Sequence, residues 1–320
     1  MEEWRKGWHP ERIKTKSSEA KVLVVGAGPG GLSAAHKAGL RGYEVALAEA
    51  STELGGRVTR EAKLPGLNAW ARVRDYRAGQ IAKMPNVNVY RDSRLSAGDI
   101  LGFGFEHVAI ATGATWRRDG IARYNLLPIA IDASMRIFTP DDLMAGHRPT
   151  DHVVVYDDDH YYMGSVLAEL LVQNGNRVTY LTPATKVAEW SFNTLEQGAI
   201  QARLLEIGVE IKVTRGLESV QAGGVTGICT YTGRLEYYSC DAVVMVTSRL
   251  PDDRLYLDLK AREAEWADHG IRTVKVIGDA NAPAAIAWAT YAGHRYAEEL
   301  EQPDIGDQLP FRREVAGLKD

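Results

Sequence analysis

A cluster of glycines near the N-terminus has the spacing that is needed to hold a pyrophosphate. It fits the pattern GxGxxG and consists of Gly26, Ala27, Gly28, Pro29, Gly30 and Gly31. In this pattern Gly26 permits a tight turn, Gly28 lets a phosphate approach the backbone, and Gly31 lets a helix pack closely on a strand. Because free N–H groups at a helix N-terminus attract anions, the cluster predicts a site for the diphosphate of a dinucleotide. A tight strand-to-helix turn without a ligand is the alternative.

An acidic residue follows at the place where a ribose would be bound. Glu49 ends a second apolar segment, 43–48, and is followed by Ala50. A carboxylate at this place accepts hydrogen bonds from the ribose of adenosine and repels a 2′-phosphate. Glu49 and Ala50 are therefore predicted to contact the adenosine half of the dinucleotide.

Three further short segments narrow the prediction to a flavin dinucleotide. They are Gly55, Gly56 and Arg57 behind Glu49, Thr112 and Gly113 after one apolar segment, and Gly278 and Asp279 after another. Together they resemble segments of two-domain flavoproteins of the disulfide-reductase-like superfamily. The resemblance implies that Asp279 holds the ribitol of FAD and that the helix after it points at the pyrophosphate. Capping of that helix is another role for Asp279, and both roles are compatible.

The hydrophobic pattern predicts the elements that must position these residues. Residues 21–25 and 43–48 are apolar runs typical of buried strands, and residues 29–40 read as a helix that ends before Gly42. These three elements form a βαβ unit. A second βαβ unit is predicted later in the chain, with strand, helix and strand at 152–156, 164–173 and 177–181.

The glycine pattern does not recur in the second βαβ unit. The loop that should cradle the pyrophosphate of NAD(P)H contains Asp157, Asp158 and Asp159 instead. Placing two phosphate charges against three carboxylates costs several kcal/mol even at a moderate effective dielectric. No NAD(P)H is therefore expected in this unit, and a merely solvated acidic turn would lead to the same expectation.

The duplicated unit predicts an α/β protein with two Rossmann-like domains and parallel central sheets, the second domain inserted in the first. A chain of 320 residues is long enough for two cores. The predicted parts are an interface leader at 1–20, a dinucleotide-binding domain at 21–150 plus 251–302, a degenerate NAD(P)-binding-like domain at 151–250, and a tail at 303–320. The insertion is expected to bring the apolar segment 274–279 back beside the strand at 21–25.

Composition excludes several classes of function. The chain is 45% hydrophobic and 25% charged with a net charge of -4, so it lacks the basic excess that nucleic-acid binding needs. It has no apolar run that could span a membrane and no signal peptide at 1–19, so a cytoplasmic location is expected. Cys229 and Cys240 are too few for a four-thiolate cluster and too far apart for a CxxC pair. No metal site, catalytic nucleophile or catalytic base is predicted in this chain.

Motifs spread over nearly the whole chain resemble the trimethylamine and dimethylamine dehydrogenase family. They are the leader 3–11, Leu64–Gly66, Asp75–Tyr76, Ala109–Trp116, and residues 277–280 and 293–295. The resemblance is to the C-terminal half of those enzymes, and the leader corresponds to the segment that joins the nucleotide domains to an FMN and 4Fe-4S barrel. More distant relatives such as 2,4-dienoyl-CoA reductase bind FAD in the first domain and NADPH in the second. The amine dehydrogenases carry ADP in the first and have lost the second site, which is the state that the acidic loop indicates.

The resemblance also implies a partner. The barrel is expected on a separate subunit, which alone would carry FMN and 4Fe-4S, and electron transfer flavoprotein is the implied acceptor. The chain is then the nucleotide-binding subunit, with FAD or ADP, of a multisubunit iron–sulfur flavoprotein dehydrogenase that acts on methylated amines or similar small substrates. A structural subunit that keeps ADP without a redox role and an NAD(P)H-dependent flavin reductase are the alternatives. Trp4, Arg5 and Trp8 are expected to contact the barrel, with a flexible N-terminus as the alternative.

Overall fold

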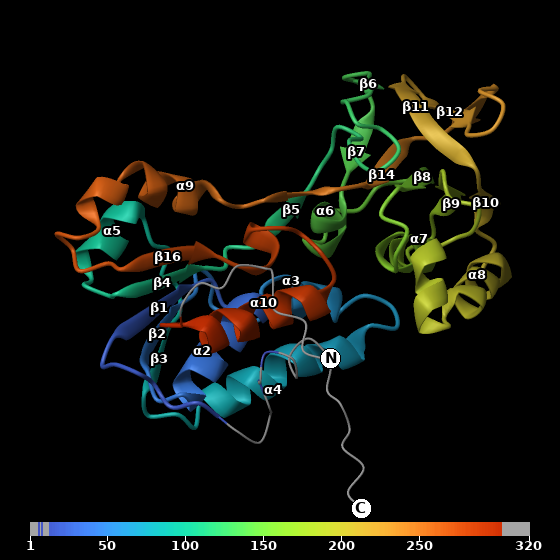
Figure 1. The fold of residues 1–320 in the computed structure, drawn as a ribbon. Coiled ribbons are helices and arrows are strands. Elements are labelled where there is room, and N and C mark those ends of the chain that lie inside the picture. Colours follow the sequence, from blue (N-terminus) through green and yellow to red (C-terminus); the bar gives the residue numbers. More distant parts are fainter. Residues whose placement is uncertain (1–5, 7, 9–12, 303–320) are drawn as a thin grey trace, which may run out of the picture. The chain divides into compact units, whose positions relative to one another are not determined.

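The structure is a computed structural model that describes Lys6, Trp8 and residues 13–302 (Figure 1). The chain divides into two compact units. The first unit consists of residues 1–56, 72–113 and 252–320, and the second unit of residues 57–71 and 114–251. The sequence predicts boundaries near residues 150 and 250, whereas the structure assigns 57–71 and 114–150 to the second unit as well.

The first unit is built on a parallel sheet in the order β16-β4-β1-β2-β3. Its strands are β1 (Lys21–Val25), β2 (Glu44–Ala48), β3 (Val87–Tyr90), β4 (His107–Ile110) and β16 (Thr273–Val276). Its helices are α2 (Pro29–Leu40), α4 (Ala71–Ile81), α5 (Ala97–Gly102), α9 (Arg254–Ala261) and α10 (Ile286–Glu299), with short 3₁₀ turns η3 (Glu263–Glu265) and η4 (Gly278–Ala280).

Alternating side chains of β1 fill two cores, one on each face of this sheet. Val22 and Val24 pack in one cluster with residues of α2 and α10. Leu23 and Val25 pack in the other with residues of α5 and α9. Because successive side chains of a strand point to opposite faces, the unbroken apolar run at 22–25 is what a strand covered on both faces requires.

The strand order differs from the sequence-based expectation in one respect. The last strand, β16, was expected beside β1 but pairs with β4, from Thr273 opposite His107 to Val276 opposite Ile110. Both edges of β1 are already occupied, because β2 pairs along one and β4 along the other. The returning strand therefore adds at the free edge of β4.

The second unit also holds a parallel sheet, in the order β10-β9-β8-β14-β7. Its strands are β7 (Arg136–Phe138), β8 (His152–Asp157), β9 (Arg177–Leu181), β10 (Glu210–Lys212) and β14 (Ala242–Val246). Its helical elements are α3 (Arg57–Glu61), η1 (Asn68–Trp70), α6 (Pro140–Met144), α7 (Met163–Gln173), η2 (Glu189–Thr194) and α8 (Gln197–Glu206). A small ribbon pairs β5 (Ala114–Trp116) with β15 (Arg249–Pro251).

A second, mostly antiparallel sheet covers one face of this parallel sheet. Its strands are β6 (Ala130–Ile131), β11 (Arg215–Gln221), β12 (Gly224–Cys229) and β13 (Leu235–Ser239). Val154 and Met245 of the parallel sheet share a buried cluster with Leu217 and Val225 of the antiparallel one. The sequence did not predict this layer, which gives the second unit two sheets in place of one.

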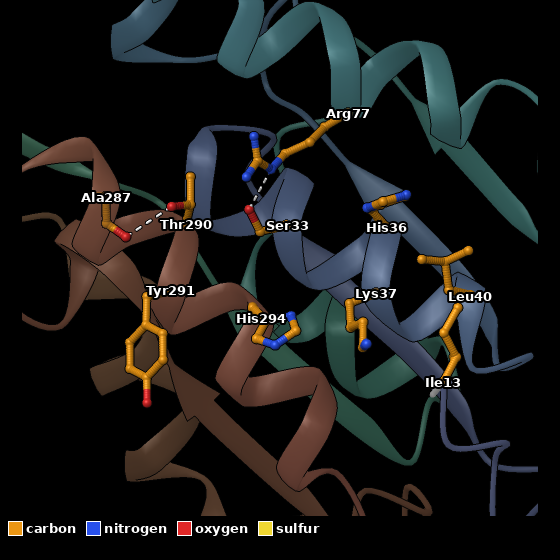
Figure 2. Close-up of a pocket in the computed structure, with 10 residues that line it drawn as sticks. All are labelled: Ile13, Ser33, His36, Lys37, Leu40, Arg77, Ala287, Thr290, Tyr291 and His294. Carbon is orange, nitrogen blue, oxygen red and sulfur yellow. Dashed lines mark hydrogen bonds between the residues drawn. The ribbon is translucent and has the colours of Figure 1, made fainter. Parts of the chain in front are cut away.

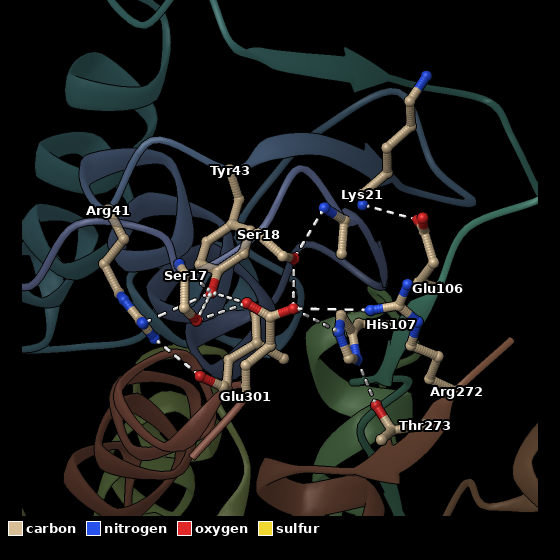
Figure 3. A network of polar contacts seen from close by, with 12 residues as sticks. Ser17, Ser18, Lys21, Arg41, Tyr43, Glu106, His107, Arg272, Thr273 and Glu301 are labelled. Atoms are coloured by element: carbon tan, nitrogen blue, oxygen red, sulfur yellow. Dashed lines mark hydrogen bonds and ion pairs between the residues drawn. The ribbon is translucent and has the colours of Figure 1, made fainter.

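A polar network around Glu301 joins several segments of the first unit (Figure 3). Its carboxylate accepts hydrogen bonds from the hydroxyl groups of Ser17 at 2.7 Å and Tyr43 at 2.6 Å, and also from Ser18. The imidazole Nε2 of His107 lies 3.6 Å away. One carboxylate therefore ties the segment before β1 to the end of α10 and to the start of β4.

No helix in the described part of the chain is long and apolar enough to cross a membrane.

Candidate functional site

The predicted cofactor residues of the first unit meet at the carboxyl edge of its parallel sheet. The glycine cluster follows β1, Glu49 follows β2, Thr112 follows β4, and Gly278 follows β16. Ligands of open α/β sheets bind at this edge. The fold thus gathers segments that lie far apart in the sequence.

Gly26 and Gly31 are required by the packing of the turn itself. Gly26 has a φ of +99°, and a Cβ on it would lie 2.4 Å from the carbonyl oxygen of Ala111. A Cβ on Gly31 would lie 1.8 Å from the carbonyl oxygen of Gly26. These distances are far below van der Waals contact, so any side chain at either position would displace the backbone just after β4 or the turn between β1 and α2.

Gly28, by contrast, faces open space. A Cβ on Gly28 would meet no heavy atom within 4 Å, and its φ of -71° is open to any residue. Among the described residues no side chain caps the N-terminus of α2, and the first turn of this helix contains no acid. The N–H groups there, after Pro29 at the first helical position, are available to an anion.

The turn at residues 26–31, called the cradle below, has two further walls. Gly30 packs against α10, where its Cβ would lie 3.2 Å from the carbonyl oxygen of Ala289. Gly55 donates its N–H to the carbonyl oxygen of Ala27 at 2.8 Å, and a Cβ on Gly56 would lie 3.1 Å from the Cα of Gly28. Gly55 and Gly56 therefore adjoin the cradle as the sequence suggests.

Glu49 is fixed by the cradle and faces it. Its Oε2 accepts the N–H of Ala27 at 2.7 Å, and its Oε1 accepts the N–H of Ser51 at 2.9 Å and the hydroxyl of Ser51 at 2.8 Å. A carboxylate offers about four lone-pair sites, so Oε2 can accept one more hydrogen bond. Ala50 is exposed beside it. Ser51, which orients Glu49, was not predicted because its role depends on contacts that the motif does not specify.

Three predicted residues have other visible roles. The hydroxyl of Thr112 donates to the carbonyl oxygen of Asp252 at 2.5 Å, and the N–H of Asp252 donates to the carbonyl oxygen of Gly113 at 2.9 Å. These bonds join the segments 72–113 and 252–320 of the first unit. Arg57 begins α3, belongs to the second unit, and pairs with Glu61 at 3.1 Å. The contact of Arg57 with a nucleotide stays a prediction.

Asp279 lies half-buried in η4, after β16, where its Oδ1 accepts the N–H of Ala284 at 3.1 Å. Helix α10 begins only at Ile286, with Ala285 as its N-cap and no side-chain cap bond. Capping of α10 by Asp279 is therefore wrong, because five residues of turn separate η4 from the helix. The carboxylate instead shapes this turn, and the ribitol contact stays a prediction.

The acidic loop of the second unit is not a solvated turn. Asp157 and Asp158 are 0% and 1% exposed, which contradicts that alternative. Asp157 accepts the hydroxyl of Tyr180 and the N–H of His160, and burial raises the pKa of Asp157 to about 6. A Cβ on Gly164 would lie 2.7 Å from the Asp157 carboxyl carbon. The Asp157 side chain therefore fills the space between the end of β8 and the start of α7.

The neighbouring groups complete a closed polar network. Asp158 accepts the N–H of Tyr124 at 2.8 Å and lies 3.0 Å from the Nε2 of His160. Burial lowers the pKa of His160, but the hydrogen bond to Asp158 and the charges of Asp157 and Asp158 together outweigh it, so the net pKa is raised. Beside this network, Tyr162 donates its hydroxyl to Glu61 at 3.0 Å. The carboxyl edge of this sheet is thus occupied by the chain's own side chains.

Two further predictions concern the N-terminal leader and the cysteines. Trp8 is 6% exposed and packs its ring 5.8 Å from that of His294, so it is buried within the chain rather than presented to a partner. Trp4 and Arg5 lie outside the described residues. Cys229 and Cys240 are unpaired, and the described residues contain no group of three His, Cys, Asp or Glu side chains that could hold a metal ion.

The chain is similar to several known oxidoreductases. The family described as pyridine nucleotide-disulphide oxidoreductase matches residues 20–289. Dimethylamine dehydrogenase from Hyphomicrobium sp. (strain x) is 37% identical, over 98% of this chain and 46% of the relative. The solved structure of histamine dehydrogenase from Rhizobium sp. 4-9 is 59% identical with a TM-score of 0.95, over 100% of this chain and 50% of that one.

A third relative agrees with these two. The structure of 6-hydroxypseudooxynicotine amine oxidase from Pseudomonas geniculata N1 is 42% identical with a TM-score of 0.89, over 92% of this chain and 44% of that one. The chain therefore spans about half the length of the relatives that it matches. The predicted resemblance to amine dehydrogenases is confirmed, and so are the α/β fold and its parallel sheets.

Proposed function

Because the chain belongs to the pyridine nucleotide-disulphide oxidoreductase family, we propose that its first unit binds FAD or ADP within an iron–sulfur flavoprotein dehydrogenase of methylated amines or similar small substrates. The cradle around Gly28 carries this proposal. An open space above Gly28 adjoins the N-terminus of α2, where a diphosphate gains N–H donors and a favourable dipole. Glu49 stands beside it with an acceptor for a ribose hydroxyl.

The residues around the cradle also fit the flavin half of FAD. Asp279 lies in η4, just after β16, and a Cβ on the adjacent Gly278 would lie 3.8 Å from the Cα of Gly30. The Gly-Asp pair therefore adjoins the start of α2, where a ribitol would leave the pyrophosphate. Bound FAD would supply a flavin that takes up and passes on electrons, whereas ADP would supply no redox group. With ADP, the site would act on structure and assembly only.

We propose no nicotinamide site in the second unit. The backbone that cradles a pyrophosphate needs glycines, and here Asp157 packs against Gly164 in that place. This occupied space argues against the alternative of a self-contained NAD(P)H-dependent flavin reductase.

Amine oxidation is assigned to a part outside the residues described. The relatives are about twice the length of this chain, and the described residues offer no metal cluster and no assembled catalytic group. We propose that a barrel with FMN and 4Fe-4S, on a partner subunit or a further domain, oxidises the substrate. Electron transfer flavoprotein is the proposed acceptor, and the cytoplasm the proposed location.

The nucleotide can be identified directly. The protein is isolated from its native source, denatured, and the released nucleotide is separated by chromatography and its absorbance recorded. FAD gives a visible flavin band and ADP does not. FMN and iron in the same preparation support the barrel, and their absence from the native material argues against it.

Gly28→Val tests the placement of the nucleotide. The side chain enters open space, so the fold should persist, but it blocks the path of the diphosphate and nucleotide binding should be lost. Gly102→Val is the matched control, because its Cβ would also meet no atom within 4 Å and it lies on the distant helix α5. A full nucleotide complement in Gly28→Val would place the ligand elsewhere.

A further inference from the structure

A cavity of about 450 Å³ lies on the flank of the first unit (Figure 2). It is lined by Ile13 and by side chains of α2, α4 and α10, not by the loops at the carboxyl ends of the strands. Its volume is within the range of small-molecule sites. Among the described residues that line it, none is Asp or Glu and four are basic: His36, Lys37, Arg77 and His294.

Arg77 is the centre of this basic lining. Its Nε donates to the hydroxyl of Ser33 at 2.7 Å, and its Nη1 donates to the carbonyl oxygen of Val73 at 3.0 Å. Both acceptors are neutral, and burial lowers the pKa of Arg77. A half-buried guanidinium with neutral partners keeps donors for an oxyanion, which Arg binds with two parallel bonds.

The other charges around the cavity leave it positive. Lys37 pairs with Glu298 at 2.7 Å, and Glu298 also lies 3.9 Å from His294, so one carboxylate faces both of these basic side chains. Burial lowers the pKa of His36, and the charges of Arg77, Lys37 and His294 lower it further. The His36 ring packs edge-on against Tyr76, 5.9 Å between ring centres. The basic neighbours of His36 thus disfavour its protonated form.

We infer that this cavity binds an oxyanion, the carboxylate or phosphate group of a small molecule, on Arg77 and His36. Arg77 donates to the anion from α4, and His36 takes up a proton as the anion arrives and reverses the positive potential. Leu40 and Ala287 offer apolar surface to the rest of such a molecule. The site is separate from the cradle at Gly28 and does not depend on it.

The test uses the full chain saturated with ADP, so that the cradle is filled. Sulfate, whose charge does not change near neutrality, is titrated by calorimetry. We expect saturable binding that tightens several-fold as the pH falls from about 8 to about 6, with proton uptake seen as a buffer-dependent heat. Acetate in place of sulfate distinguishes a carboxylate ligand from a phosphate-like one, and binding of either supports the inference.

Two variants and a control assign the binding to this cavity. Arg77→Gln should weaken sulfate binding about tenfold or more while leaving ADP affinity unchanged. His36→Asn should remove the pH dependence but keep binding at high pH. The exposed Arg94→Gln is the matched control and should change nothing. Sulfate binding should survive in Gly28→Val, which separates this site from the nucleotide site. Absence of saturable binding, or equal affinity in Arg77→Gln and the parent, would overturn the inference.

Discussion

Glu49 shows how one side chain serves both the fold and the ligand. Its carboxylate is held between the N–H of Ala27 in the cradle and the N–H and hydroxyl of Ser51. These bonds fix its oxygen atoms before any ligand binds, so a ribose loses little free energy in ordering the site. The negative charge also disfavours a 2′-phosphate, which points to an unphosphorylated adenosine ribose.

Glu49→Gln should lower the affinity for ADP about tenfold, or by about 1–2 kcal/mol. A glutamine keeps one carbonyl oxygen, but its amino group must face one of the donors that the carboxylate now accepts. Calorimetric titration of ADP into nucleotide-free protein measures the effect. Glu53→Gln is the control, because Glu53 is exposed in the same loop and its backbone oxygen, not its carboxylate, accepts the hydroxyl of Ser51. Equal ADP affinity in the two variants would show that Glu49 does not contact the nucleotide.

Single residues were predictable where their role is local. The positions of Gly26 and Gly31 follow from the motif, because the close approaches of 2.4 Å and 1.8 Å occur within one strand, turn and helix and the strand beside them. The burial of Asp157 was not predictable. It depends on Tyr180, which lies on the next strand, and on a cavity that only the folded unit defines.

Elements were predictable in proportion to their hydrophobic pattern. The strands β1, β2 and β8 are apolar runs of five or six residues and were recognised. By contrast, β6 and β7 have only two and three residues and show no hydrophobic periodicity. The antiparallel strand β12 was obscured by its glycines. A Cβ on Gly227 would lie 2.9 Å from the Tyr238 ring of β13, so packing demands a residue that otherwise argues against a strand.

The Glu301 network links several elements, and its contribution to the stability of the fold depends on pH. Partial burial alone would raise the pKa of Glu301, but hydrogen bonds from Ser18, Tyr43 and Ser17 lower it to about 2. The folded pKa lies below the unfolded one. The ionised carboxylate therefore stabilises the fold above about pH 4.5, and this contribution disappears as the pH falls towards 2.

Glu301→Gln should reduce the free energy of unfolding at pH 7 by about 1–2 kcal/mol, since one charge-assisted acceptor becomes neutral. The difference between variant and parent should shrink between about pH 4.5 and 2. Urea unfolding followed by circular dichroism at several pH values measures it. Glu206→Gln, an exposed substitution on α8, should show no such pH-dependent difference. A constant difference across the range would mean that the Glu301 charge does not matter.

At the scale of the whole molecule, two units of related topology differ in what the carboxyl edge of the parallel sheet presents. In the first unit the edge is backbone, glycine and open space. In the second it is Asp157, Asp158 and His160, each paired with another group of the chain. The sequence predicted this difference from charge, and the structure adds that the space itself is filled.

The second unit should therefore bind neither NADH nor NADPH. Charge alone would allow weak binding at low pH, because Asp157 has a pKa of about 6 and becomes neutral below it. Its side chain would still stand 2.7 Å from where a Cβ of Gly164 would be, so protonation of Asp157 weakens the repulsion but leaves the obstruction. NADH and NADPH should therefore still fail to bind at about pH 5.5. This result would distinguish filling of the site from electrostatic repulsion.

Calorimetry with the first unit saturated by ADP measures this, because the cradle at Gly28 could otherwise accept the adenosine half of NADH. Titration of ADP into the nucleotide-free protein serves as the positive control. A parallel experiment adds NADH under anaerobic conditions and follows the visible absorbance of any bound flavin, which should not bleach. A micromolar dissociation constant for either dinucleotide at either pH would show that the network around Asp157 opens to admit a ligand. Binding that appears only at about pH 5.5 would assign the exclusion to charge, and the packing of Asp157 against Gly164 would then not be its cause.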